Sequence, residues 1–161
     1  MRIEFTYAIF TGIVLLACAS DDVSSDNSRP PAQSGNEAEV AQVAVSGQPS
    51  AYQFSVTINS PDTGCDQYAD WWEVVSEEGE LIYRRVLLHS HVDEQPFTRS
   101  GGAVVIEDDE TVWVRVHMNP IGYSTQAMKG TVNRGFVAMQ TPNGFAENLS
   151  SEEPLPSGCN F

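Results

Sequence analysis

Apolar and polar residues alternate one by one along several short segments of this chain from about residue 50 onward. The clearest case reads YQFSVTIN, in which Tyr52, Phe54, Val56 and Ile58 occupy every second position. A period of two places these side chains on one face of an extended strand, as in a strand with one buried face. The alternation predicts strands at residues 52–59, 70–76, 80–92, 103–107, 111–118 and 135–140.

Residues that favour turns separate these segments. Pro61 and Gly64 mark a loop, Gly79 marks a tight turn, and Pro and Gly residues predict loops at 93–102 and 119–133. Short strands at this spacing, with almost no helical period, predict an all-β domain of about six or seven antiparallel strands. An immunoglobulin-like or fibronectin-like β-sandwich is the first expectation, and a small β-barrel is the alternative.

The same alternation predicts which side chains point away from the core. Within 111–118 the valines take the core face, so Trp113, Arg115 and His117 point outward. Within 80–92 the larger aliphatic side chains favour the opposite face from Tyr83, Arg85, His89 and His91.

The orientation of residues 70–76 depends on the turn that follows them. A three-residue loop with a bulge at Gly79 places Trp72 and Val74 in the core and Trp71 and Glu73 on the outer face. A two-residue turn would reverse all four side chains, because a one-residue slip exchanges the faces. The first register is favoured because Glu78 is a poor residue for a two-residue type I′ turn.

If these strands share one sheet, aromatic and charged side chains collect on a single outer face. Exposed Trp, Tyr and Arg are typical of recognition surfaces. The first hypothesis is therefore non-catalytic binding of a protein, peptide or glycan through Trp71, Glu73, Tyr83, Arg85, Trp113 and Arg115. The structural alternative is that the charged groups form ion pairs and the aromatic rings pack under loops.

Metal binding is the second functional hypothesis. His89 and His91 are two residues apart, so in a strand both imidazoles would leave the same side about 7 Å apart at Cα. His117, or Glu73, would complete a zinc or copper site. No other cofactor is expected. The chain has no nucleophile elbow or phosphate-binding loop, so it is not expected to be an enzyme.

The N-terminus reads as a targeting segment. Arg2 precedes an apolar run at residues 5–16, which is too short for a helix that spans a bilayer. The run ends in Leu15-Leu16-Ala17-Cys18, which resembles the lipobox of bacterial lipoproteins. An ordinary signal peptide ending near Ala19 is the alternative.

The resemblance implies cleavage before Cys18 and a lipid on its sulfur, with acyl chains such as palmitate that hold the protein at the membrane. Residues 1–17 would then be the signal peptide. By resemblance to Gram-negative lipoproteins, Ala19 after the cysteine implies sorting to the outer membrane.

Residues 18–48 are rich in Ser, Asp, Pro and Gly, and they predict a flexible linker after the lipidated cysteine. Within the linker, residues 38–45 could form a short helix or an early strand. The folded domain is predicted at 49–161.

Two cysteines remain in the folded part. Export places Cys65 and Cys159 in an oxidising compartment, where they are expected to form a disulfide.

The charge of the chain limits its partners. Its formal net charge is −14, which argues against nucleic acid because phosphate contacts need clustered Lys and Arg.

Overall fold

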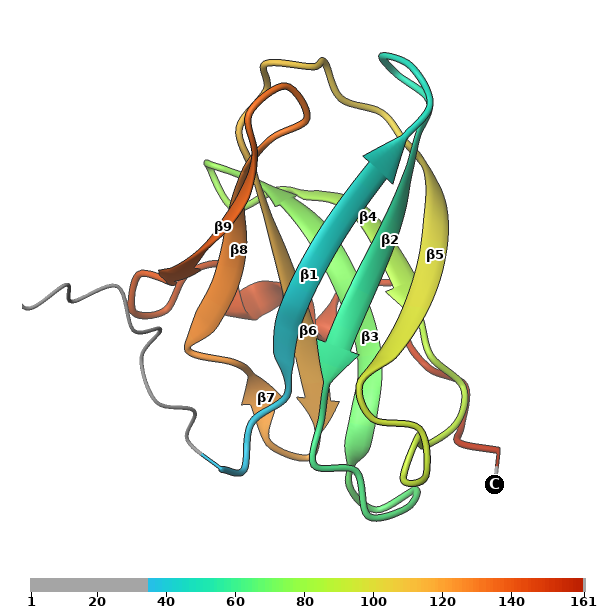
Figure 1. The fold of residues 1–161 in the computed structure, drawn as a ribbon. Helices are drawn as coiled ribbons and strands as arrows, with labels where there is room; N and C mark the ends of the chain where they lie inside the picture. Colours follow the sequence, from blue (N-terminus) through green and yellow to red (C-terminus); the bar gives the residue numbers. More distant parts are fainter. Residues whose placement is uncertain (1–34, 161) are drawn as a thin grey trace, which may run out of the picture.

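The computed structural model describes residues 35–160, so the predicted signal peptide, the lipobox and most of the predicted linker lie outside the described residues. The described residues form two antiparallel sheets packed face to face (Figure 1). The predicted all-β sandwich is confirmed, and the sheets do not close into the alternative barrel.

The smaller sheet has three strands in the order β1-β2-β5. They are β1 (Glu39–Ser46), β2 (Tyr52–Asn59) and β5 (Phe97–Val104). The larger sheet has the order β4-β3-β6-β8-β9, and a short strand, β7, pairs with β6. Its strands are β3 (Tyr68–Ser76), β4 (Leu81–Val86), β6 (Val112–Asn119), β7 (Gly122–Tyr123), β8 (Gln126–Thr131) and β9 (Gly135–Gln140).

The strand order is that of an immunoglobulin-like sandwich. With β1, β2 and β5 as strands A, B and E, and β3, β4, β6 and β8 as C, C′, F and G, the sheets read A-B-E and C′-C-F-G, and β9 is an additional strand beyond G. Trp72 on β3 is fully buried between the sheets, where this architecture places a tryptophan on strand C. Strand β2 of the smaller sheet supplies one wall of the core, and β3 and β6 of the larger sheet supply the other.

The alternating residues form the core that the sequence predicts. Phe54, Val56 and Ile58 of β2 are fully buried, and so are Val114 and Val116 of β6. Burying an aliphatic or aromatic side chain of this size stabilises a fold by about 1.5–3 kcal/mol. This pattern fixes both strand register and the identity of the outward residues on β3 and β6.

The folded domain begins before the predicted boundary at residue 49. Residues 39–46, placed in the linker with a strand as one alternative, form β1 and pair with β2. The register of β1 against β2 shifts between Val40 and Gln42, which indicates a bulge. The bulge interrupts the period of two, so alternation does not predict this strand.

Residues 97–102, predicted to be part of a loop, belong to β5. Gly101 allows this strand to lie close to β3 and β4, because a Cβ there would lie 2.5 Å from the Tyr83 hydroxyl and 3.0 Å from the Trp72 ring. The glycine that suggested a loop instead permits a close approach between the sheets. Residues 105–107, predicted to continue the strand, follow its end.

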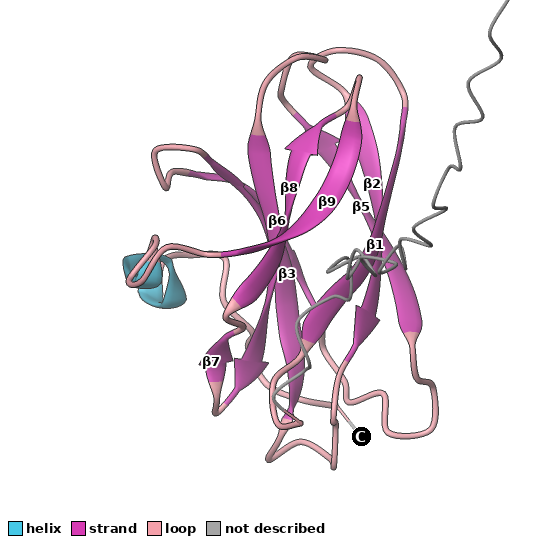
Figure 2. Ribbon diagram, turned by 60° about the vertical axis from the view of Figure 1, so that its left-hand side comes forward, coloured by secondary structure: helices cyan, strands magenta, loops and turns pink. Residues whose placement is uncertain are grey.

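A segment of residues 141–160, called here the C-terminal segment, crosses the outer face of the larger sheet. It contains the 3-10 helix η1 (Glu147–Ser151). Figure 2 shows η1 beside the larger sheet, on the side away from β1, β2 and β5. The predicted disulfide joins Cys159 in this segment to Cys65 in the loop before β3. Among residues 35–160 no helix has the length and apolar character needed to cross a membrane.

Candidate functional site

The outward face of β3 and β6 is covered rather than exposed. Trp71 and Glu73 of β3 point outward with Trp113 and Arg115 of β6, as predicted, and Trp72 lies in the core. Yet these four outward residues are only 3%, 0%, 4% and 1% exposed, in that order. The C-terminal segment covers them, so the predicted open binding face is wrong at these positions and the structural alternative holds.

Apolar residues of the C-terminal segment form a second hydrophobic cluster on this face. Leu149 is buried against Val75 and Trp113, and Phe145 packs around them. The rings of Trp113 and Phe145 have centroids 5.4 Å apart. A second core layer of this kind stabilises the sheet in the same way as the layer between the sheets.

Glu73 lies at the centre of a buried ionic network. The Nε atom of Arg84 donates to Oε2 of Glu73 at 2.7 Å, and the Nε atom of Arg115 donates to Oε1 at 2.8 Å. The side chains of all three residues are between 0% and 1% exposed. One carboxylate therefore neutralises one of two buried guanidinium groups.

Backbone carbonyls of the C-terminal segment accept further hydrogen bonds from the two arginines. Arg115 donates to the carbonyls of Phe145 at 2.7 Å and Ala146 at 2.8 Å. Arg84 donates to the carbonyl of Leu149 at 2.7 Å and to those of Glu152 and Pro154. The two arginines thus connect β4 and β6 to the C-terminal segment, and each nitrogen of their guanidinium groups already donates to an acceptor within the protein.

Aromatic rings surround the two guanidinium groups. Arg84 lies 4.5 Å from the centre of the Trp71 ring, and Arg115 lies 3.6 Å from that of Tyr123. Burial raises the pKa of the Tyr123 hydroxyl far above its ordinary value, so that this group stays protonated beside the network. These contacts add cation–π attraction to the ion pairs.

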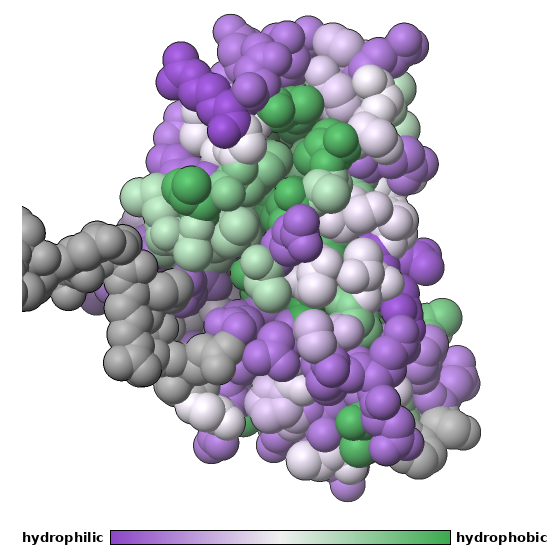
Figure 3. Space-filling model, in the orientation of Figure 1, coloured by the Kyte–Doolittle hydropathy of each residue, from purple (hydrophilic) through white to green (hydrophobic). Residues whose placement is uncertain are grey.

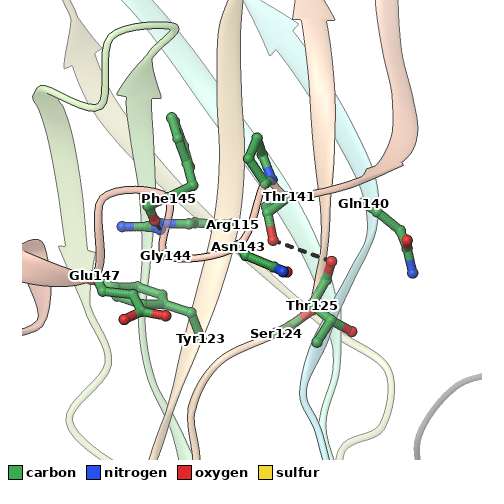
Figure 4. Close-up of a pocket in the computed structure, with 11 residues that line it drawn as sticks. Arg115, Tyr123, Ser124, Thr125, Gln140, Thr141, Asn143, Gly144, Phe145 and Glu147 are labelled. Carbon is green, nitrogen blue, oxygen red and sulfur yellow. Dashed lines mark hydrogen bonds between the residues drawn. The ribbon is translucent and has the colours of Figure 1, made fainter.

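A cleft of about 340 Å³ lies beside the network, between Tyr123 and the start of the C-terminal segment (Figure 4). Thr141 donates a hydrogen bond to the carbonyl of Thr125 across one wall. Arg115 lines the cleft with its Nη atoms already bonded to backbone carbonyls. Arg115 therefore has a structural role at this cleft, which Glu147 also lines.

Tyr83 and Arg85, the other two predicted face residues, lie on the opposite face from the prediction. The β3–β4 register shifts between Val74 and Val75, which leaves Ile82 as an extra residue in β4. A bulge exchanges the faces beyond it, so Tyr83 packs against Trp72 in the core and Arg84 meets Glu73. On the face predicted to point into the core, Arg84 interrupts the apolar residues at positions 82, 86 and 88. This interruption is the sequence signal that the two faces of β4 are exchanged.

The three histidines do not converge. Strand β4 ends at Val86, so His89 and His91 lie in a loop and not in the predicted long strand. His117 on β6 bonds through Nδ1 to Oδ1 of Asp70 at 2.7 Å and stacks on Trp71 at 3.7 Å between centroids. Within residues 35–160 no three His, Cys, Asp or Glu side chains come together as a metal site.

His91 is buried against Phe97 and close to Asp62. Its ring stacks on Phe97 at 3.7 Å between centroids, and its Nδ1 lies 3.9 Å from Oδ2 of Asp62. That carboxylate also accepts the backbone N–H of His91 at 2.8 Å. Burial, followed by the positive charges of Arg99 and His89, lowers the pKa of His91 to about 4.

Replacing His91 with phenylalanine is expected to reduce the loss of stability in acid. In wild type the unfolded chain binds a proton at this imidazole below pH ~6.5 and the folded chain does not, so stability falls between pH ~6.5 and ~4. This term amounts to at most about 3 kcal/mol. Urea unfolding of both proteins at pH 7, 5.5 and 4 should show that the variant gains relative to wild type as pH falls. A difference that is independent of pH would contradict the burial of a neutral imidazole.

Exposed apolar side chains gather on the side of the sandwich formed by β1 and β9. Val137 is 62% exposed and Met139 is 45% exposed, both on β9. Val43 and Val45 of β1 are partly buried. Figure 3 shows apolar residues together on this part of the surface. Alternation predicts β9 as a strand but does not show that it lies at the edge of a sheet, because strand order does not follow from alternation.

Comparison with known proteins gives one partial similarity. A protein of Halomicrobium mukohataei described as "Putative lipoprotein" is 47% identical over 78 residues, which cover 48% of this chain and 38% of the relative. This chain therefore spans less than half the length of the curated relative that it matches. No family model and no solved structure matches the chain. The relative comes from a halophilic archaeon, so it lends no support to Gram-negative outer-membrane sorting.

Proposed function

We propose that the chain is an exported, lipid-anchored protein whose sandwich domain binds another polypeptide, without catalysis, through the β1–β9 side. This surface, called here the β1–β9 patch, comprises Val43, Val45, Val137 and Met139. The lipobox-like Leu15-Leu16-Ala17-Cys18 and the similarity to a protein described as a lipoprotein support the anchor. The exposed apolar strand β9 carries the proposal of binding.

The position of β9 supports strand addition. It is the last strand of its sheet and pairs with β8 along one edge, so its other edge has no strand partner among residues 35–160. Such an edge offers free backbone N–H and C=O groups to an extended segment of another chain. Natural edge strands usually carry charged residues that block this pairing, whereas β9 reads GFVAMQ.

The apolar character of the patch supports a protein rather than a glycan as the ligand. Both faces of β9 present carbon side chains, since Val137, Ala138 and Met139 are consecutive and all exposed. In a chain of net charge −14 the patch carries no charged side chain of its own. Apolar contacts with alternate residues of a pairing strand would supply affinity and selectivity.

Photo-crosslinking in the membrane of the producing cell tests this proposal. A photoreactive phenylalanine derivative at Val137 of the full chain is expected to give an adduct of defined mass, and Met139→Glu is expected to abolish it. The same probe at Glu78, which is exposed at the β3–β4 turn, is the matched control and should give no such adduct. Identical adducts at both positions, or none at Val137, would refute binding through the β1–β9 patch.

A further inference from the structure

A small cavity lies on the opposite side of the sandwich from the β1–β9 patch, where edge strands β4 and β5 lie next to each other. Its volume is about 160 Å³, which is below the range of about 300–1,000 Å³ for sites that bind drug-sized ligands. Arg85 of β4, Arg99 of β5, and His89 and His91 of the connecting loop line it, with an apolar wall from Val86 to Leu88. We call it the β4–β5 pocket.

The β4–β5 pocket gathers positive groups in a strongly acidic chain. The chain has eight Lys and Arg against 22 Asp and Glu. Arg84 and Arg115 are used by Glu73, and Lys129 pairs with Glu77 at 2.6 Å. Two further arginines and two of the three histidines line this one small cavity. Four basic side chains in one small cavity are more than we expect from a surface on which acidic residues predominate.

Among residues 35–160, only one of the two arginines of the pocket pairs with a carboxylate. Arg85 is exposed and has no ion pair or side-chain hydrogen bond among residues 35–160. Arg99 pairs with Glu94 at 2.8 Å, but the Glu94 side chain is 59% exposed and can share that guanidinium group. Solvent-exposed pairs of this kind contribute about 0–1 kcal/mol, so an incoming anion can compete.

His91 supplies an independent sign of a ligand site. The residue is 3% exposed, and neither its Nδ1 nor its Nε2 has a hydrogen-bond partner within the described part of the chain. Buried polar atoms without a partner are rare in folded proteins and call for a water, an ion or a ligand. The His89 ring lies 4.5 Å from that of His91 between centroids, which places a second imidazole at the same cavity.

We propose that the β4–β5 pocket binds a small oxyanion of the phosphate class, held by Arg85 and Arg99 and by a ring N–H of His91. Planar guanidinium groups bind phosphate through paired N–H donors, and two of them on neighbouring edge strands can face the same oxyanion. A metal cation is disfavoured here because two guanidinium groups would repel it. This site is separate from the β1–β9 patch, so neither proposal depends on the other.

Titration of the full chain with inorganic phosphate, followed by calorimetry at fixed ionic strength, tests the site. Arg85→Gln is expected to weaken binding at least about tenfold, since a hydrogen bond to a charged group is lost. Because Arg85 has no partner in the described domain, the variant should keep the wild-type melting temperature. The matched control is Arg134→Gln, which removes the same charge from the exposed β8–β9 turn and should change affinity less than about twofold.

Nuclear magnetic resonance of the His91 ring gives a second measurement. In the protein without phosphate, burial and the charges of Arg99 and His89 lower the pKa of His91, and the carboxylates of Asp62 and Glu94 raise it. Bound phosphate adds a further negative charge and should therefore raise the pKa of His91. An unchanged His91 signal at saturating phosphate would overturn its role. Equal weakening by Arg134→Gln, or no binding in wild type, would overturn the site.

Vesicles distinguish free phosphate from a phosphate carried by lipid. Vesicles of phosphatidylglycerol in phosphatidylcholine, and vesicles of phosphatidylcholine alone, are mixed with the full chain and its Arg85→Gln and Arg134→Gln variants. Binding of inorganic phosphate without vesicle retention beyond that of Arg85→Gln assigns a soluble anion. Retention on the phosphatidylglycerol vesicles in excess of that on phosphatidylcholine alone, lost in Arg85→Gln but kept in Arg134→Gln, assigns a lipid headgroup. If neither inorganic phosphate nor the vesicles show a dependence on Arg85, the proposal is wrong.

Discussion

Replacing Glu73 with glutamine is expected to lower the free energy of unfolding by about 3–5 kcal/mol. The carboxylate is fully buried and accepts hydrogen bonds from Arg84 and Arg115. Glutamine keeps the size of the side chain but removes the charge and turns an –NH2 donor toward a guanidinium donor. Two buried cations then remain without an anion, which costs far more than the loss of an exposed ion pair.

The measurement is urea unfolding at constant salt, read by far-ultraviolet circular dichroism and extrapolated linearly to water. Glu77→Gln is the matched control, because Glu77 pairs with Lys129 and its side chain is 49% exposed. That control is expected to cost less than about 1 kcal/mol. If Glu73→Gln is no more harmful than Glu77→Gln, the network does not hold the C-terminal segment on the sheet. Should Glu73→Gln fail to fold, Arg115→Met gives a milder test, since it leaves Glu73 paired with Arg84.

Removal of the disulfide is expected to have an effect of similar size. Cys65 and Cys159 are 94 residues apart in sequence and their Cα atoms lie 5.6 Å apart. Closing a loop of this length restricts the unfolded chain, and the chain-entropy estimate is about 4–5 kcal/mol. Cys65→Ser/Cys159→Ser should therefore lose about this much free energy of unfolding, measured in the same urea experiment.

Reduction of wild type provides the control for the disulfide. Wild type in excess reductant should unfold at the same urea concentration as the double serine variant, and reductant should not affect that variant. The arginine bonds to Phe145, Ala146 and Leu149 do not involve the disulfide, so the tryptophans should stay covered after reduction. A loss below about 1 kcal/mol would mean that the unfolded chain is not restricted by the bridge.

Much of the fold could be predicted from the sequence because a period of two is a local signal. Tyr52–Asn59 and Gly135–Gln140 have the bounds that alternation predicts. The turn at Gly79 sets the register of β3, since this glycine has a φ of 89° that other residues rarely adopt. Where a bulge interrupts the period, as at Ile82 or between Val40 and Gln42, the prediction fails.

The site was harder to predict because exposure depends on contacts between distant segments. Alternation places Trp113 and Arg115 on the outer face, but no local pattern shows that residues 145–154 will return to cover them. Both arginines donate hydrogen bonds to backbone carbonyl groups. Every residue has one, so the sequence does not show which of them will accept these hydrogen bonds. Arg84 interrupts the aliphatic side chains at alternate positions 82, 86 and 88. This interruption is a local sign of the buried ion pair with Glu73.

Acrylamide quenching of tryptophan fluorescence tests the covered outer face most directly. All three tryptophans of the chain lie in β3 and β6, and they are 3%, 0% and 4% exposed. We expect native protein to show a blue-shifted emission and weak quenching, and the same protein in urea to show strong quenching. Strong quenching of the native protein, with its circular dichroism unchanged, would mean that Trp71 and Trp113 face solvent and that the C-terminal segment does not cover the sheet.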